Sequence, residues 1–238
     1  MIGKLRAVAL DAADITGLAA FYTGLAGWTG AYAEADWITL STPDGWRIGL
    51  QHAPNHVPPR WPDPAHPQQA HLDLRVPDLD AAAERATGLG ASLLRRNETW
   101  YTMADPAGHP FDLCLNPNDP NTTLMGVMLD CPDAKELSVF YAELLDKPVT
   151  YQAEGVAMIG NEGAQPIMFQ QVETYAPPCW PDPAHPQQVH LDVTVEDIEA
   201  AERGALAIGA SRLPGDGVSW RVYADPAGKP FCLCWDIE

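Results

Sequence analysis

The string WPDPAHPQQ occurs twice in this sequence, at Trp61–Gln69 and again at Trp180–Gln188. After one further residue, each copy leads into a His-Leu-Asp triplet, at residues 71–73 and 190–192. Nine identical residues in the same context indicate an internal duplication in which the two copies are offset by 119 residues. The fold must therefore accommodate the same segment twice.

The same offset aligns most of the remaining sequence. The stretch ADPAGHPFDLC at residues 104–114 aligns with ADPAGKPFCLC at residues 224–234 after one inserted residue. The polar, turn-rich stretch NPNDPNTT at residues 116–123 joins the copies, as expected of a linker. A repeat of this length predicts duplicated domains, which we place at residues 1–117 and 122–238.

Hydrophobic periodicity predicts that each copy contains two βαβββ units. In the second copy, Asp133 and Glu136 form a capping-box pattern at the start of the first helix. The predicted elements of the first copy are a helix ending near Gly27, a helix at residues 78–89, and strands at residues 5–11, 29–33, 37–41, 46–52, 70–76, 91–95, 99–104 and 110–115. The repeated loop falls between the two units of a copy, and we interpret it as a crossover within one domain.

The strand after the repeated loop shows a clear alternation. In HLDLRV, apolar side chains alternate with His71 and Asp73, and HLDVTV repeats the pattern from His190. Strand side chains alternate between faces, so the apolar set is expected to pack on the helices and the polar set to face the other way. Gln69 and Gln188 lie two positions before the histidines, and we expect them on the same polar face.

Several motifs resemble the vicinal oxygen chelate superfamily: FYTGLAGW from Phe21, HLDLRVPDLDAA from His71 and DPAGHPF from Asp105, all within paired βαβββ units. This superfamily includes glyoxalase I, bleomycin-resistance proteins, fosfomycin-resistance enzymes and extradiol dioxygenases. The tandem form resembles the actinobacterial glyoxalase-like domain proteins. The resemblance covers nearly the whole chain and implies an α+β fold with tandem glyoxalase/bleomycin-resistance-like domains. In each domain, two βαβββ units are expected to form a cup-shaped mixed sheet with the helices outside.

The resemblance also implies positions for a metal. Metal-using members place a His from the first strand of a unit and a Glu from the last strand on the inner face of the cup. The corresponding positions are Ala7, Gly49, His71 and Asp112 in the first copy, and Gly126, Met168, His190 and Cys232 in the second. A catalytic divalent site needs about three protein ligands. Both sets are incomplete, so we predict no metal cofactor. If Zn, Ni, Fe or Mn is bound, His71 and Asp112 are its expected ligands.

We therefore predict a metal-independent small-molecule-binding protein that binds or sequesters a metabolite or a drug. The candidate ligand-binding residues are His71, His190, Gln69, Gln188, Trp61, Trp180, Asp112 and Cys232.

The histidines suit hydrogen bonding or acid–base chemistry near neutral pH, or a structural contact with the loop. The tryptophans suit stacking on a ligand or anchoring of the loop on the core. Asp73 and Asp192 suit pairing with a histidine or an arginine, but we favour a capping or surface role for them. The alternative function is a glyoxalase-type lyase, isomerase or dioxygenase with a divalent metal.

Charge restricts the partners further. The 238 residues carry a formal net charge of −18, which disfavours nucleic acid and either favours a cationic ligand or serves solubility.

The sequence shows no membrane-spanning stretch and no secretory signal pattern, so we expect a cytoplasmic protein. Five cysteines, an odd number, favour reduced thiols over a disulfide framework. We expect an intrachain pseudo-dimer that is monomeric as a whole.

Overall fold

The computed structural model describes residues 2–161, 163–182 and 185–236, and within them four βαβββ units follow one another. The first unit contains β1 (Lys4–Ala12), α1 (Ile15–Ala26), β2 (Thr29–Ala33), β3 (Trp37–Ser41) and β4 (Arg47–His52). The second contains β5 (Ala70–Val76), α2 (Leu79–Gly88), β6 (Ser92–Arg96), β7 (Trp100–Ala104) and β8 (Pro110–Leu115). The third contains β9 (Thr123–Cys131), α3 (Ala134–Leu145), β10 (Val149–Ala153), β11 (Val156–Ile159) and β12 (Ile167–Gln171). The fourth contains β13 (Val189–Thr194), α4 (Ile198–Ala207), β14 (Ser211–Arg212), β15 (Trp220–Ala224) and β16 (Pro230–Cys234). The predicted α+β class and order of elements are confirmed.

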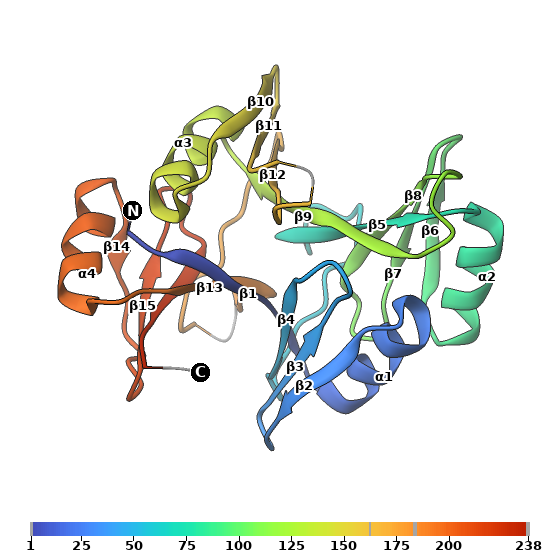
Figure 1. Ribbon diagram of the computed structural model, residues 1–238, viewed down its shortest axis with the longest axis horizontal. Helices are drawn as coiled ribbons and strands as arrows, with labels where there is room; N and C mark the ends of the chain where they lie inside the picture. Colours follow the sequence, from blue (N-terminus) through green and yellow to red (C-terminus); the bar gives the residue numbers. More distant parts are fainter. Residues whose placement is uncertain (1, 162, 183–184, 237–238) are drawn as a thin grey trace.

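The units combine into two eight-stranded mixed sheets, and each sheet takes one unit from each sequence copy (Figure 1). Sheet A has the order β14-β15-β16-β13-β1-β4-β3-β2 and joins the first unit to the fourth. Sheet B has the order β10-β11-β12-β9-β5-β8-β7-β6 and joins the second unit to the third. At the centre of each sheet, antiparallel strands from different copies pair, β1 with β13 and β5 with β9.

The repeated loop therefore does not connect two units of one sheet, and its interpretation as a crossover within one domain is wrong. It leads from β4 in sheet A to β5 in sheet B, and its counterpart leads from β12 in sheet B to β13 in sheet A. In the second loop, Pro183 and Ala184 lie outside the described residues. Alternation within a strand identifies the strand but carries no information on which copy supplies its neighbour. Sequence reasoning does not detect the exchange for this reason.

The two loops also contact each other through reciprocal hydrogen bonds. Gln69 N donates to Gln188 Oε1 at 3.0 Å, and Gln188 N donates to Gln69 Oε1 at 2.8 Å. The side-chain amides extend the contact, because Gln69 Nε2 donates to Pro186 O at 2.9 Å and Gln188 Nε2 donates to Pro67 O at 3.0 Å. Both glutamines are buried. All four hydrogen bonds join one sequence copy to the other, so we call this contact the glutamine clasp.

Each of the four helices begins at an aspartate N-cap whose carboxylate accepts a backbone N–H within the first turn. The caps are Asp14, Asp78, Asp133 and Asp197. Asp133 accepts from Glu136 N at 2.9 Å, which places the start of α3 where the sequence predicts it.

The helices cover one face of each sheet and bring the sheets together. Helix α1 contacts β3 and β4 of its own sheet and also α2, which belongs to sheet B; the two helices lie side by side in Figure 1. Phe21 in α1 contacts Phe111 in β8 at a ring-centroid distance of 5.8 Å, and Phe140 in α3 contacts Phe231 in β16 at 5.9 Å. The buried apolar residues of both sheets form one continuous core.

Two buried tyrosines tie these helices to the other sheet. Tyr22 Oη donates to Asp105 Oδ2 at 3.0 Å, and Tyr141 Oη donates to Asp225 Oδ2 at 2.9 Å. Asp105 Oδ1 also accepts the backbone N–H groups of its own turn, at 2.9 and 3.0 Å. The repeated DPAG turn is therefore organised around a buried carboxylate that also holds a helix of the other sheet.

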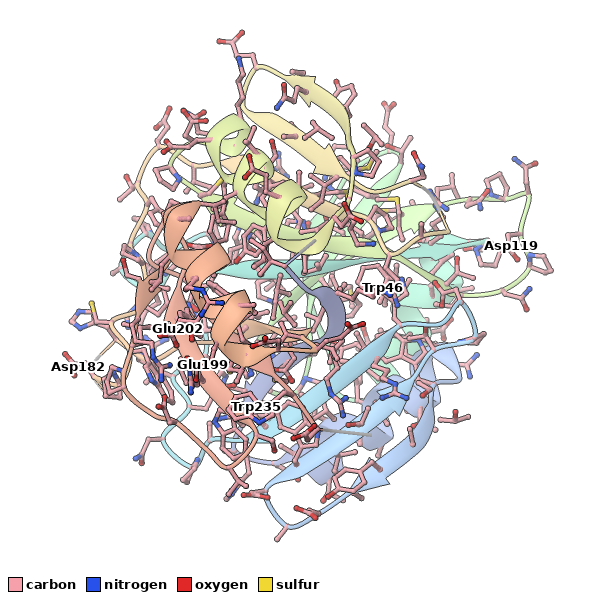
Figure 2. The ribbon with its side chains drawn as sticks, turned by 60° about the vertical axis from the view of Figure 1, so that its left-hand side comes forward. Trp46, Asp119, Asp182, Glu199, Glu202 and Trp235 are labelled. Atoms are coloured by element: carbon pink, nitrogen blue, oxygen red, sulfur yellow. The ribbon has the colours of Figure 1, made fainter. Side chains whose placement is uncertain are left out.

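The linker between the copies lies apart from this core. Figure 2 shows Asp119 on a loop that projects from the body of the molecule. Among the described residues, no helix combines the length and the apolar character needed to cross a membrane.

Candidate ligand-binding cups

The face of each sheet that is turned away from its helices carries the candidate site; we call these faces cup A and cup B, after their sheets. In cup B, parallel pairing of β5 with β8 places Asp73 opposite Asp112, and His71 shares the face with Asp73. His71 Nε2 lies 3.5 Å from Asp73 Oδ1 and 4.0 Å from Asp112 Oδ2. The three residues each offer one metal-ligand atom, and these atoms lie within 4.8 Å of one another.

Cup A repeats this arrangement with one replacement. Asp192 on β13 lies opposite Cys232 on β16, and His190 Nε2 lies 3.5 Å from Asp192 Oδ1. The ligand atoms of these three residues also lie within 4.8 Å of one another. The thiol of Cys232 stands where cup B has the carboxyl group of Asp112.

Both histidines contact a glutamine that is itself bound to a carboxylate. In cup B, Gln68 Nε2 lies 3.1 Å from His71 Nδ1 and donates to Asp130 Oδ1 at 3.1 Å. In cup A, Gln187 Nε2 lies 3.2 Å from His190 Nδ1 and donates to Asp11 Oδ2 at 3.0 Å. These four partners are buried, and none was predicted from the sequence. The signal that identifies them is the recurrence of both glutamine and aspartate at the offset of the duplication.

Burial controls the electrostatics of cup B. It raises the pKa of Asp73 to about 8, and the neighbouring charge of Asp112 adds to the rise. Burial also raises the pKa of Asp112, although a hydrogen bond with Thr102 and the charge of Arg95 act against it. Burial lowers the pKa of His71 to about 4. At neutral pH, His71 is therefore uncharged and the carboxyl pair retains a proton.

Cup A differs because it contains a single carboxylate between the histidine and the thiol. Burial acts to lower the pKa of His190, but the hydrogen bond to Asp192 and the charges of Asp192 and Asp11 outweigh it and the pKa is raised. Burial and the charge of Asp192 raise the pKa of the Cys232 thiol well above its ordinary value. Cys232 is therefore protonated at neutral pH, and the cup holds no reactive thiolate.

The structure brings together some of the predicted site residues and separates others. His71 and Asp112 meet in cup B, and His190 and Cys232 meet in cup A. Gln69 and Gln188 do not share the polar faces with the histidines; they form the glutamine clasp. The surface role favoured for the two aspartates is wrong, because Asp73 is 4% exposed and Asp192 is 8% exposed. Each lies 3.5 Å from the Nε2 atom of its neighbouring histidine, as the alternative of a pairing with histidine predicts.

The tryptophans of the repeated loop have different surroundings. Trp180 Nε1 donates to Pro214 O at 2.8 Å, which anchors the second loop beside β15. Trp61 lines a cavity of about 160 Å³ together with Gln68, Asp130 and Tyr175. This cavity lies next to cup B, since Gln68 also contacts the site histidine.

Two other tryptophans lie on the cup faces and were not predicted as site residues. Trp100 on β7 is paired with Cys114, and Trp220 on β15 is paired with Cys234. Trp100 is 40% exposed and Trp220 is 41% exposed. Each copy therefore presents a large aromatic side chain at the same position of its cup.

A family model described as a glyoxalase-like domain matches the chain twice, over residues 7–114 and 126–234. The chain belongs to this glyoxalase-like family. Its structural neighbours confirm the vicinal oxygen chelate fold. Glyoxalase I from Zea mays is 15% identical with a TM-score of 0.65, and the alignment covers 97% of this chain and 92% of that chain. A putative dioxygenase from Bacillus subtilis is 12% identical with a TM-score of 0.64, over 99% of this chain and 86% of that chain. At these identities the likeness concerns the fold. No curated protein matches the sequence.

The resemblance predicts four metal positions in each sequence copy, but each sheet takes one unit from each copy, so the four positions of a cup come from both copies. Two of the four in each cup carry no His, Cys, Asp or Glu side chain. In cup A these are Ala7 and Gly49, and the indole of Trp37 lies against Gly49, where an added Cβ would lie 2.3 Å from the ring. In cup B they are Gly126 and Met168, whose Cε would lie 3.0 Å from a Cβ on the glycine. The four-position metal pattern therefore does not fit the residues of this protein.

Proposed function

We propose that this glyoxalase-like protein is a metal-independent binder of small organic cations and that cup B holds the cation. The observation that carries the proposal is the pair of carboxyl groups on Asp73, which is buried, and Asp112, which is partly buried; they face each other across β5 and β8. Trp100 lies on the same face of the adjacent strand β7 and is 40% exposed. The net charge of −18 adds a long-range attraction for cations.

A buried carboxyl pair favours a cation because an opposite charge stabilises the ionised carboxylates that burial disfavours. Asp73 has a pKa of about 8 through burial and through the charge of Asp112. A bound ammonium or guanidinium group gives both carboxylates an opposite charge and lowers their pKa values. Binding near pH 7 is therefore expected to release a proton from the pair.

Trp100 supplies an aromatic surface for the same ligand. It precedes Thr102 by two residues on β7, so the two side chains share a face, and Thr102 lies opposite Asp112. An aromatic ring beside carboxylates suits alkylated ammonium groups, which gain both cation–π and ionic attraction.

Cup A has the same frame but is expected to bind cations more weakly. Cys232 replaces the second carboxylate, and the remaining carboxylate of Asp192 already faces His190. The ring of Trp37 also lies against the strand at Gly49, which supports a smaller or differently shaped ligand space.

The proposal is tested by calorimetric titration of the protein with tetramethylammonium, butylammonium and guanidinium chlorides at pH 7, with neutral tert-butanol as the comparison. Saturable binding of at least one cation is expected, with a heat that depends on the ionisation enthalpy of the buffer because a proton is released. Asp112→Asn is expected to weaken binding by at least about tenfold, since it leaves one carboxyl group facing the cation. Cys232→Ser, at the matched position of cup A, is expected to leave the affinity unchanged.

Two results would overturn the proposal. One is the absence of saturable binding for all three cations, or equal binding of tert-butanol. The other is near-stoichiometric Zn, Ni, Fe or Mn in protein purified without chelator, which would contradict metal independence.

A further inference from the structure

The two site histidines are oriented by an arrangement that occurs twice and that the proposed cation binding does not use. In each cup, Nδ1 of the imidazole faces the amide nitrogen of a glutamine, at 3.1 Å in cup B and 3.2 Å in cup A. In each cup, the glutamine Nε2 also donates to an aspartate, Asp130 in cup B and Asp11 in cup A. The histidine, glutamine and aspartate therefore form a chain of three side chains that we call the orienting chain.

The aspartate determines which way the glutamine amide points. A carboxylate only accepts hydrogen bonds, whereas the amide group offers two N–H donors on its nitrogen and an acceptor on its oxygen. Asp130 Oδ1 therefore selects the nitrogen of Gln68, and a second donor, Gln170 Nε2 at 2.7 Å, marks the same oxygen as an acceptor. Both N–H groups of the Gln68 amide are then used, one for Asp130 and one for His71.

We infer that Gln68 holds the neutral side chain of His71 in the tautomer that carries its proton on Nε2, and that Gln187 selects the same tautomer in the neutral form of His190. Nδ1 accepts from the glutamine, so the remaining ring nitrogen must be the donor. Nε2–H then points to Asp73 at 3.5 Å in cup B and to Asp192 at 3.5 Å in cup A.

This tautomer explains why neither cup is prepared for a metal even though each gathers three ligand-type side chains. A metal-binding imidazole donates its other N–H to a carboxylate or carbonyl oxygen, and this leaves a lone pair for the ion. Here the other nitrogen faces a donor, so Nε2 has no lone pair to offer. Gln68 and Gln187 are thus positioning residues that commit the histidines to hydrogen-bond donation within the cup.

The orienting chain is also assembled from both sequence copies. In cup B, Gln68 comes from the first copy and Asp130 from the second; in cup A, Gln187 comes from the second copy and Asp11 from the first. The same donor and acceptor order therefore recurs in two cups that differ in their third ligand-type side chain. Burial keeps His71 neutral near pH 7, where its pKa of about 4 leaves it unprotonated.

The inference is tested first on the unmodified protein, by long-range ¹H–¹⁵N correlation spectra of ¹⁵N-histidine-labelled chain at pH 7. The signals of the site histidine in cup B are assigned by their loss in His71→Asn. We expect Nδ1 of His71 to resonate as an unprotonated nitrogen and Nε2 as a protonated one. Protonation on Nδ1 with Nε2 bare would overturn the inference, and this measurement needs no variant of Gln68 or Asp130.

A paired exchange then reverses the chain. In Gln68→Glu/Asp130→Asn, the new carboxylate accepts from His71 Nδ1–H while the new amide nitrogen donates to it. We expect the tautomer of His71 to switch, and the affinity of cup B for Zn²⁺ in calorimetric titration to rise about 10–100-fold, the range found for carboxylate partners of metal-binding histidines. Adding His71→Asn should abolish the gain.

The matched exchange in cup A, Gln187→Glu/Asp11→Asn, is the control and should leave the His71 signals and the Zn²⁺ affinity of cup B unchanged. An unchanged tautomer and Zn²⁺ affinity in a folded Gln68→Glu/Asp130→Asn protein would overturn the inference. Failure of cation binding would leave these results intact, because none of the spectra or Zn²⁺ titrations involves an organic cation.

Discussion

The glutamine clasp predicts a large effect on stability from one side chain that touches no candidate ligand. In Gln69→Ala, the backbone N–H of Gln188 loses its acceptor at 2.8 Å and the carbonyl of Pro186 loses its donor at 2.9 Å. The Gln188 N–H group lies in a buried contact, where leaving a hydrogen-bonding group unsatisfied costs about 1–3 kcal/mol. The bond to the Pro186 carbonyl is only partly buried, so its loss is expected to cost about 0.5–1.5 kcal/mol. The two losses together are expected to lower the free energy of unfolding by about 1.5–4.5 kcal/mol.

Urea denaturation followed by circular dichroism measures this effect. With a slope of about 3 kcal/mol/M, a loss of 3 kcal/mol lowers the midpoint by about 1 M. Gln188→Ala removes the symmetry-related pair of hydrogen bonds and is expected to give a loss of similar size. Gln171→Ala, at an exposed position, is the control and should change stability by less than about 0.5 kcal/mol. A loss for Gln69→Ala no larger than that of the control would refute the reasoning.

Three further predictions follow from the fold and the cups. The raised pKa of Asp73 means that this group stabilises the fold below its unfolded pKa of 3.8 and that the contribution is lost as pH rises towards about 8. Asp73→Asn should therefore reduce the fall in the free energy of unfolding between pH 4 and pH 8, by on the order of 1 kcal/mol per pH unit at most, as measured by urea denaturation. An unchanged pH dependence would contradict the assignment. Tyr22→Phe removes the buried hydrogen bond to Asp105 and should cost about 1.5–3 kcal/mol in the same unfolding assay, and a loss below about 0.5 kcal/mol would show that the bond contributes little. Isolated residues 1–117 contain units of two different sheets, so this half-chain is expected to form dimers, and to form a one-to-one complex with residues 122–238 when the two are mixed, in light-scattering measurements of mass; two monomers that remain separate would contradict it.

Local signals in the sequence predict the units of the fold but not their pairing. The alternation in β5 and the cap at Asp133 depend on residues close together in the chain, and both follow from elementary rules. The strand beside β1 is β13, which comes from the other copy. Two duplicated copies offer almost identical edges, so the sequence contains no signal that distinguishes pairing within a copy from exchange between copies.

The candidate site was also predicted only in part from the sequence. The family resemblance places His71 with Asp112 and His190 with Cys232, and the structure brings each pair together. The expectation for Gln69 fails because β5 begins at Ala70, so the two-residue period of a strand does not extend back into the loop. Contacts made by loop residues across copies, such as those of the orienting chain, depend on tertiary structure and have no local pattern.

The exchange of units has a consequence for how this molecule can diverge. If two identical, unlinked chains built the same pair of sheets, every replacement would appear in both cups at once. Here the peptide linker makes the pairing intramolecular, so it persists at any dilution. In this single chain, the residues of the two cups occupy different positions in the sequence and can be replaced separately. Cup B therefore contains Asp112 where cup A contains Cys232, a difference that two identical chains could not show. The two cups can therefore evolve different ligand preferences, while the core that they share couples the folding of both sheets.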